Sequence, residues 1–521
     1  MQRLSNGGSA DTSAKNESSH VSGPAPRRNP LMSDGDTAQR LILRGGASAG
    51  LGLIFRLGAR LVFMFMAARL FGAAAFGAYS LAVAIIELAV AIGGLGMKRY
   101  LFKLLEERGE REPGHILLDT IVLVALTSIL LSVGIAAAAA LVPASLLAPQ
   151  TAAGMLWAAP MVAGQALIDL FSAATRWKHL MRYAVVSRSL VEPYVGTAGA
   201  VAAYLLGFQA TGLLIGYGAG TLAALGYTAF GTGKCYGGLR FGSYRPRVAQ
   251  LAATFRESAM ATATDAAAAL FYRIDLYLVG AFLGEAPAGI YAMARQFRTP
   301  IRQTRQAFDS LLTPIVAKTL SADGPATTAT AIASAVRMIL AIQLAMVVAL
   351  IAVGDDILRW FGPAFVAGYG ATVVLGLAET IQGAFSITDL LLLYLRGRLA
   401  LLVTIVMSVV NVAAALPLIT WYGIDGAGLS VLLAFVSGAL VRRWLLHSRF
   451  AVSTPLLHAG GPLLAGAGAA AVALASRFGL PGGAPLHVAT LVTALAIYGS
   501  AILLWQRTTG ETLRLTGFRL A

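Results

Sequence analysis

The sequence contains few charged residues for its length. Asp, Glu, Lys and Arg make up 12% of its 521 residues, whereas hydrophobic residues make up 57%. A soluble domain usually carries about 25% charged residues. The mean hydropathy of +0.73 points the same way, so the composition excludes an ordinary soluble protein. It predicts an all-α, polytopic membrane protein whose apolar segments are spanning helices.

Residues that catalyse reactions or bind metals are also scarce. Cys235 is the only cysteine, so no intrachain disulfide can form. The six histidines are scattered, and none lies near cysteine or carboxylates at the spacing of metal ligands. No nucleophile elbow, phosphate-binding loop or dinucleotide-binding fingerprint occurs. The sequence therefore predicts no catalytic residues, no metal, no cofactor and no enzyme activity.

Apolar segments follow one another from about residue 45, each near the length that crosses about 30 Å of hydrocarbon. About fourteen such segments are present, and we divide them into two bundles of six and a final pair. The predicted organisation is a disordered cytoplasmic tail at 1–40, six-helix bundles at 41–230 and 258–446, a cytoplasmic linker at 231–257, two extra spans at 447–505 and a cytoplasmic tail at 506–521.

The connections between these segments alternate in charge. One set is basic, and the other is short and almost free of Lys and Arg. The basic set comprises 98–111, 176–188, 234–256, 396–398, 442–449 and the tail after 507. Because basic loops stay in the cytoplasm, both termini are expected there. The formal net charge of +16 is therefore explained by loops beside membrane lipids, and no nucleic-acid partner is predicted.

Two short motifs recur in the same order along the chain. FGAAAFGAY at 71–79 matches LGEAPAGIY at 283–291, and LGFQATGL at 206–213 matches YGIDGAGL at 422–429. Each copy falls on an outer turn between two spans, where glycine suits a tight backbone. An even number of spans separates the copies, so the two bundles are predicted to be parallel repeats with one orientation.

The segment after the second copy of the first motif is rich in arginine. Arg295, Arg298, Arg302 and Arg305 are spaced by three, four and three residues, which places them on one helix face over about 15 Å. A charge at the bilayer centre costs about 2.5–3.5 kcal/mol, so this stripe is expected to face a water-filled cavity or a bound anion. The alternative is an amphipathic helix on the membrane surface. A surface helix would move every later basic loop outside, so we favour a span.

Further charged residues fall inside the predicted spans. Guanidinium groups suit phosphate because their planar fork forms bidentate hydrogen bonds and stays charged. Seven arginines are predicted to line the crevice between the bundles and to bind a pyrophosphate: Arg56, Arg60, Arg273, Arg295, Arg298, Arg302 and Arg305. The alternative is that each arginine pairs with a buried carboxylate, and for Arg273 the candidates are Asp275 and Asp265. Four carboxylates are predicted to be counter-charges or sites of H⁺ or Na⁺ coupling: Asp265, Asp275, Glu379 and Asp389.

These motifs resemble a known family. The stretches at 71–79, 273–291 and 355–362 are similar to polysaccharide-biosynthesis flippases of the O-antigen type, in the multidrug/oligosaccharidyl-lipid/polysaccharide exporter superfamily. The resemblance covers about residues 45–446. It implies a transporter of the bacterial cytoplasmic (inner) membrane that moves an undecaprenyl-pyrophosphate-linked oligosaccharide to the outer leaflet by alternating access. It also implies a cationic central cavity, and a polysaccharide polymerase and glycosyltransferases as protein partners.

Two other transport functions remain open. A lipid II flippase would share the number of spans and the cationic cavity. A multidrug or organic cation antiporter of the same fold would need an acidic or aromatic cavity, which the arginines oppose. A membrane glycosyltransferase or polymerase is disfavoured because the outer loops are too short to carry catalytic groups. We therefore interpret the sequence as that of a flippase for lipid-linked oligosaccharides in exopolysaccharide or related polysaccharide biosynthesis.

Overall fold

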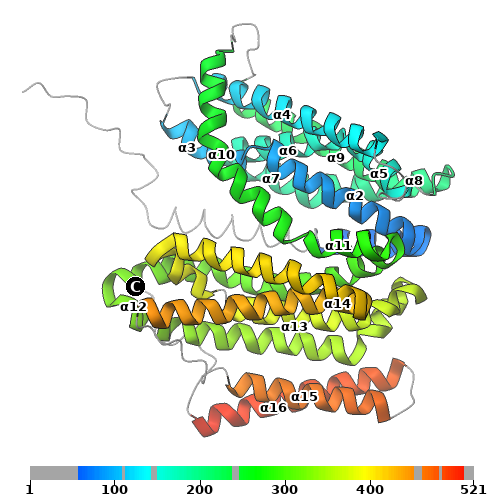
Figure 1. Ribbon diagram of the computed structural model, residues 1–521, viewed down its shortest axis with the longest axis vertical. Helices are drawn as coiled ribbons and strands as arrows, with labels where there is room; N and C mark the ends of the chain where they lie inside the picture. Colours follow the sequence, from blue (N-terminus) through cyan, green and yellow to red (C-terminus); the bar gives the residue numbers. More distant parts are fainter. Residues whose placement is uncertain are drawn as a thin grey trace, which may run out of the picture. The chain divides into compact units, whose positions relative to one another are not determined.

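Figure 1 presents a computed structural model of the chain. It describes residue 55 and residues 57–107, 112–141, 149–209, 211–237, 246–385, 387–450, 460–479 and 484–509. All of these belong to a single unit, Gly52–Ala521. The tail predicted at 1–40 lies outside the described residues, as do Arg56, the side chain of Asp389 and most of the tail predicted at 506–521.

Regular structure in the described part of the chain is helical throughout, which confirms the predicted all-α class. Residues 57–66 form a helical segment that runs into η2. The first half continues with η2 (Ala67–Phe71), α2 (Gly72–Gly93), α3 (Met97–Glu107), α4 (Pro113–Leu141), α5 (Pro149–Ala158), α6 (Met161–Trp177), α7 (Met181–Val186), η3 (Ser187–Val191), α8 (Glu192–Leu205) and α9 (Gly212–Cys235). The second half contains α10 (Val248–Phe271), α11 (Ile274–Leu283), α12 (Glu285–Phe361), η5 (Pro363–Gly368), α13 (Tyr369–Phe385) and α14 (Ile387–Phe450), followed by α15 (Gly460–Gly479) and α16 (Ala484–Thr509).

Among the described residues, seven helical stretches are long and apolar enough to cross a membrane, or nine if each of two bent pairs is one span. This count of spans is smaller than the fourteen predicted because some helical stretches hold more than one span. The stretches Leu57–Glu107 and Arg398–Phe450 contain 51 and 53 residues, whereas one span needs about 20. The backbone leaves the helical region within these stretches at Gly72 and Gly423. Each stretch therefore holds two of the predicted spans.

Helix α12 also holds two predicted spans, at 288–316 and 331–353. Gln343 Nε2 donates a hydrogen bond of 2.8 Å to the carbonyl oxygen of Ile301, although these residues are 42 positions apart. In a straight helix they would be separated by about 63 Å, at about 1.5 Å per residue. Helix α12 therefore turns back on itself between Ile301 and Gln343, and its arginine-bearing first part packs against its apolar last part.

The two copies of the first repeated motif share a backbone conformation and lie against each other. Gly72 has φ +77° and ψ 179°, and Gly284 has φ +89° and ψ −172°, a region open essentially only to glycine. The helices that follow, α2 and α12, then approach very closely. A Cβ atom added at Gly77 would fall 1.8 Å from the carbonyl oxygen of Glu285. This contact joins the two halves of the chain. It lies at the turns that the distribution of basic loops predicts to be on the outer side of the membrane.

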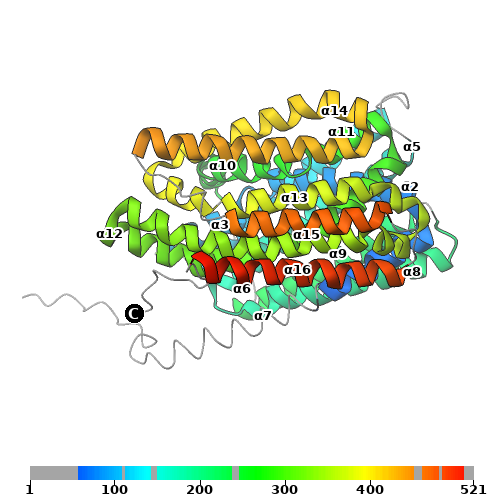
Figure 2. The same cartoon turned by 90° about the horizontal axis from the view of Figure 1, so that it is seen from below.

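The last two helices pack as a pair. Helices α15 and α16 lie side by side in both views of the molecule (Figures 1 and 2). The hydroxyl of Tyr498 in α16 donates a hydrogen bond of 2.8 Å to the carbonyl oxygen of Ala341 in α12. Ala465, Ala469 and Tyr498 also belong to the main cluster of buried hydrophobic residues. The pair is therefore anchored to the last part of α12 rather than held by its loop alone.

Candidate functional site

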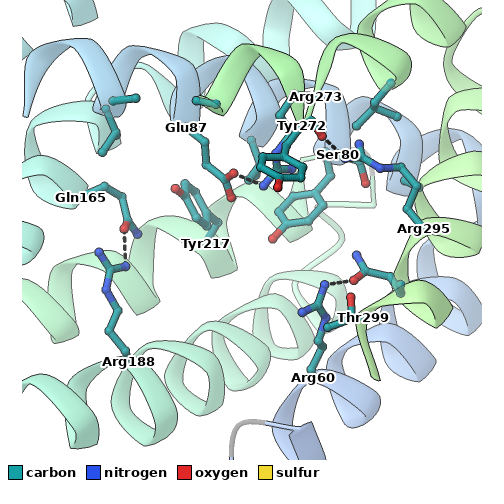
Figure 3. Close-up of a pocket in the computed structure, with 18 of the residues that line it drawn as sticks. Arg60, Ser80, Glu87, Gln165, Arg188, Tyr217, Tyr272, Arg273, Arg295 and Thr299 are labelled. Atoms are coloured by element: carbon teal, nitrogen blue, oxygen red, sulfur yellow. Dashed lines mark hydrogen bonds and ion pairs between the residues drawn. The ribbon is translucent and has the colours of Figure 1, made fainter. Parts of the chain in front are cut away.

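A cavity of about 770 Å³ lies between the two halves of the chain. Helices α2, α3, α6 and α9 contribute residues to one wall, and α10, α11 and the first part of α12 contribute to the opposite wall. Figure 3 shows side chains of both walls pointing into the space between them. The close crossing of α2 and α12 brings these walls together, because both helices continue from that crossing along the cavity.

Basic side chains outnumber acidic ones on the cavity wall. The basic lining residues are Arg60, Lys98, Arg99, Arg188, Arg273, Arg295, Arg298 and Arg302, and the acidic ones are Glu87, Asp169, Glu192 and Asp265. Five of the seven predicted arginines are thus brought together. Arg305 is not among the residues that line the cavity. Arg56 lies outside the described residues.

Two buried carboxylates support the arginine-bearing face of α12. Arg295 Nε lies 3.5 Å from Asp275 Oδ2, and Arg298 Nε lies 3.6 Å from Glu379 Oε1. Arg298 is 4% exposed and Glu379 is 2% exposed, so the first part of α12 does not lie on a membrane surface. Asp275 also accepts a hydrogen bond of 2.8 Å from the hydroxyl of Tyr291. Asp275 and Glu379 are therefore placed as counter-charges to this arginine face.

The next arginine along α12, Arg302, is less well satisfied than these neighbours. Its Nε atom is buried and has no hydrogen-bond partner among the described residues. A buried donor without a partner costs about 1–3 kcal/mol. An anion that accepts a hydrogen bond from Arg302 would remove that cost. We therefore expect an anionic ligand to be stabilised most strongly next to this side chain.

Arg273 pairs with a carboxylate from the other half of the chain. It lies at the 46° bend between α10 and α11 and forms an ion pair with Glu87 of α2. The alternative considered from the sequence was a pair with Asp275 or Asp265, and the ion pair formed is with neither of them. Asp275 pairs with Arg295 instead.

Two further polar contacts cross between the halves. Arg99 of α3 pairs with Asp265 of α10, so Asp265 is a counter-charge, although to a residue of the other half. Arg60 donates a hydrogen bond to the side-chain oxygen of Gln296 in α12. Together with the pair formed by Arg273, these contacts make the relative position of the two walls depend on polar groups inside the cavity.

The wall formed by the first half carries a connected polar network that the sequence did not reveal. Arg188 Nη1 donates hydrogen bonds of 2.6 Å to Gln165 Oε1 and 2.9 Å to Glu192 Oε2, and Arg188 also pairs with Asp169. Lys98 Nζ lies 3.2 Å from Asp169 Oδ2. Figure 3 shows the bond between Arg188 and Gln165. The available signal was the i,i+4 spacing of Arg188 and Glu192 inside an apolar segment, which places both side chains on one helix face.

One group of side chains has the composition of a metal site. Asp355, Asp356 and His487 offer ligand atoms within 4.8 Å of one another. His487 Nδ1 already lies 2.6 Å from Asp356 Oδ2, and Arg359 lies 4.0 Å from Asp355 and 3.8 Å from Asp356. Because cationic and hydrogen-bonding partners occupy this group, we interpret it as a polar anchor between the end of α12 and α16.

Comparison with known families identifies the chain. The family model of polysaccharide biosynthesis proteins matches residues 42–320, more than half of the sequence. The chain belongs to this family. No curated protein matches the chain in sequence.

Solved structures resemble the chain in fold. One is the lipid II flippase MurJ in an inward closed conformation, with a TM-score of 0.71, 14% identity, and coverage of 88% of this chain and all of that one. Another is an inward-facing multidrug resistance transporter of the MATE family and MOP superfamily, with a TM-score of 0.62, 12% identity, and coverage of 76% and 98%. A MATE protein in a bent conformation has a TM-score of 0.54, 13% identity, and coverage of 79% and 95%. These likenesses and the family confirm the resemblance and the polytopic transporter fold that the sequence predicted.

Proposed function

We propose that this protein moves an undecaprenyl-pyrophosphate-linked oligosaccharide from the cytoplasmic to the outer leaflet of a bacterial inner membrane. The observation that carries the proposal is the excess of basic side chains around a cavity between the two halves. The family supports the link to polysaccharide precursors. The proposed role is that of a transporter, with no catalytic residue, no cofactor, and both termini in the cytoplasm.

The chemistry of the arginine face fits a pyrophosphate. Arg295 and Arg298 use Nε atoms near Asp275 and Glu379, so their orientation is fixed before a ligand arrives. A preordered planar guanidinium loses little entropy when it forms a bidentate bond with a phosphate. Arg302 adds a donor that has no partner among the described residues. The pyrophosphate is therefore proposed to bind along this face, with the glycan in the cavity and the prenyl chain in the lipid.

The contacts between the halves suggest how transport proceeds. A phosphate that binds Arg273 would compete with Glu87 for it, and this would weaken a contact that holds the walls together. The two halves would then rock about the site, as in other transporters built from repeats. An inside-negative potential would favour outward movement of a negative headgroup by about 2.3 kcal/mol per charge per 100 mV. We propose this potential as the driving force, with H⁺ coupling through the buried carboxylates as the alternative.

A lipid II flippase is the second candidate, because the MurJ structure has the same fold over the whole of its chain. Lipid II is also a pyrophosphate-linked glycolipid, so the cationic cavity suits both substrates. Export of organic cations is disfavoured, since eight of the twelve charged residues that line the cavity are basic. In the proposed pathway, glycosyltransferases supply the substrate and a polysaccharide polymerase consumes it.

The experiment uses the purified protein in lipid vesicles with three substrates in separate preparations. These are a fluorescent undecaprenyl-pyrophosphate-linked oligosaccharide, lipid II and the organic cation ethidium. We expect the oligosaccharide to cross and Arg302→Gln to slow it at least about tenfold, the effect of a lost charge-assisted hydrogen bond. Arg305→Gln, about one helical turn further along α12, is the matched control and should transport normally.

The other results distinguish the candidates. Transport of lipid II alone would replace the proposed substrate with that of the second candidate. Transport of ethidium alone would refute a phosphate site in this cavity. Equal transport by the wild-type protein and Arg302→Gln would also contradict the proposed role of the arginine face.

A further inference from the structure

The two walls of the cavity differ in net charge. The wall formed by α12 and α11 presents Arg273, Arg295, Arg298 and Arg302. The wall formed by the first half also carries Arg60, Glu87 and Arg99. Its part next to α6 and α8 contains two basic side chains, Lys98 and Arg188, and two acidic ones, Asp169 and Glu192, which pair with one another. The wall formed by α12 and α11 is therefore cationic, whereas this part of the opposite wall, called the neutral wall below, has no net charge and is rich in hydrogen-bonding groups.

We propose that this neutral wall recognises the uncharged sugar next to the pyrophosphate, with Tyr79, Gln165, Glu192 and Tyr217 as the contacting residues. The inference rests on the proposed function, because it assigns the pyrophosphate to the opposite wall. The headgroup joins a charged diphosphate to an uncharged polyhydroxyl ring. The diphosphate suits the cationic wall, and the ring suits the neutral wall. The four residues are proposed to decide which sugar the protein accepts.

The hydrogen bonds of the network fix its polar atoms in place. Gln165 Nε2 donates to Glu192 Oε1 at 2.7 Å and to Thr221 Oγ1 at 3.0 Å, while Arg188 holds Gln165 Oε1 and Glu192 Oε2. A carboxylate accepts about four hydrogen bonds, so each oxygen of Glu192 retains a free acceptor position. Sugar hydroxyls donate to such acceptors, and a prearranged acceptor loses little entropy on binding.

Two tyrosines extend this wall. Tyr79 of α2 and Tyr217 of α9 both line the cavity, and their ring centroids are 6.3 Å apart with an interplanar angle of 78°. No described residue forms a hydrogen bond with either hydroxyl. A tyrosine offers an apolar ring face together with a polar tip, which matches a sugar ring with its apolar face and hydroxyl edge.

The size of the cavity limits how much of the glycan is recognised. Its volume is about 770 Å³, within the range of about 300–1,000 Å³ of sites that enclose a small molecule. A volume of this size encloses a diphosphate with one or two sugars. The proposed specificity therefore concerns the sugar attached to the pyrophosphate rather than the far end of the glycan.

The test compares the dissociation constants of two soluble probes for the detergent-purified protein. One is farnesyl pyrophosphate, and the other is farnesyl pyrophosphate carrying N-acetylglucosamine, glucose or galactose. We expect the wild-type protein to bind one of the sugar-bearing probes about tenfold more tightly than farnesyl pyrophosphate, the gain from one or two net hydrogen bonds. Tyr217→Phe and Glu192→Gln should bring this ratio close to one while the affinity for farnesyl pyrophosphate stays the same.

Matched controls separate recognition from folding. Tyr227→Phe removes a hydroxyl from the same helix but not from the cavity wall, and it should keep the wild-type ratio. Arg302→Gln should weaken all probes in parallel. Thermal unfolding of each variant checks that Tyr217→Phe and Glu192→Gln are folded.

Each remaining result has a defined meaning. Equal binding of all probes by the wild-type protein would overturn the inference and leave the pyrophosphate site intact. Parallel loss of every probe in Tyr217→Phe and Glu192→Gln would assign the network a structural role and also overturn it. Failure of the wild-type protein to bind farnesyl pyrophosphate would refute the proposed function, and the inference with it.

Discussion

The crossing of α2 and α12 allows a quantitative prediction about the exchange between open and closed states. A Cβ atom at Gly77 would lie 1.8 Å from Glu285 O and 2.8 Å from Gly289 N, whereas real Cβ contacts stay above 3.0 Å. Gly77→Ala must therefore separate the two backbones by about 1.2 Å. Overpacking typically costs about 1–3 kcal/mol, and here the upper end applies because the obstacle is backbone on a rigid helix. About 3 kcal/mol shifts the equilibrium between two states about 100-fold.

The expected result is a protein that opens more often to the exterior. The assay places a cysteine at Ser80, which lines the cavity, in a background where Cys235 is replaced by Ser. A membrane-impermeant maleimide added outside sealed vesicles then reports access to the cavity. Gly77→Ala and Gly289→Ala should each raise the rate of labelling, by up to about 100-fold if the wild-type protein is mostly closed on this side.

The control is a glycine with free space around it. Gly134 lies in α4, and a Cβ atom there would meet nothing within 4 Å. Gly134→Ala should therefore leave the labelling rate unchanged and not lower the temperature of unfolding, since alanine favours a helix. If Gly77→Ala labels as slowly as Gly134→Ala and unfolds at the same temperature, the crossing is not a tight contact and the reasoning fails.

Three further predictions concern single contacts. Arg298→Gln leaves the buried Glu379 without its counter-charge, so it should lower the free energy of unfolding by about 3–5 kcal/mol. In thermal unfolding, the double variant with Glu379→Gln should recover part of this loss. No recovery would mean that the two side chains are not coupled. Asp265→Asn removes the ion pair with Arg99 between the halves. Maleimide labelling of a cysteine at Ser80 from the cytoplasmic side should then be faster. An unchanged labelling rate would show that the pair does not hold the walls together. Gly284→Ala forces alanine into φ +89° and should lower the free energy of unfolding by about 1–3 kcal/mol relative to Gly134→Ala. Equal unfolding temperatures of the two variants would contradict this account of the turn.

The sequence alone determined the properties that depend on local composition and spacing. The scarcity of charge and the length of the apolar segments fixed the all-helical membrane fold, because a bilayer accepts few other structures. The two copies of the FG…GAY-like motif predicted equivalent turns, and Gly72 and Gly284 adopt nearly the same backbone angles. The spacing of Arg295, Arg298 and Arg302 placed these arginines on one face, and that face lines the cavity.

Which charges meet depends on how distant segments pack in the fold. Glu87 lies 186 residues from its partner Arg273, and no helical periodicity connects positions that far apart. The neutral wall around Arg188 takes side chains from α3, α6, η3, α8 and α9, so it depends on these helices packing together. The ion pairs and the boundary of the cavity arise from contacts between distant segments. They therefore follow from packing and not from the order of residues along one helix.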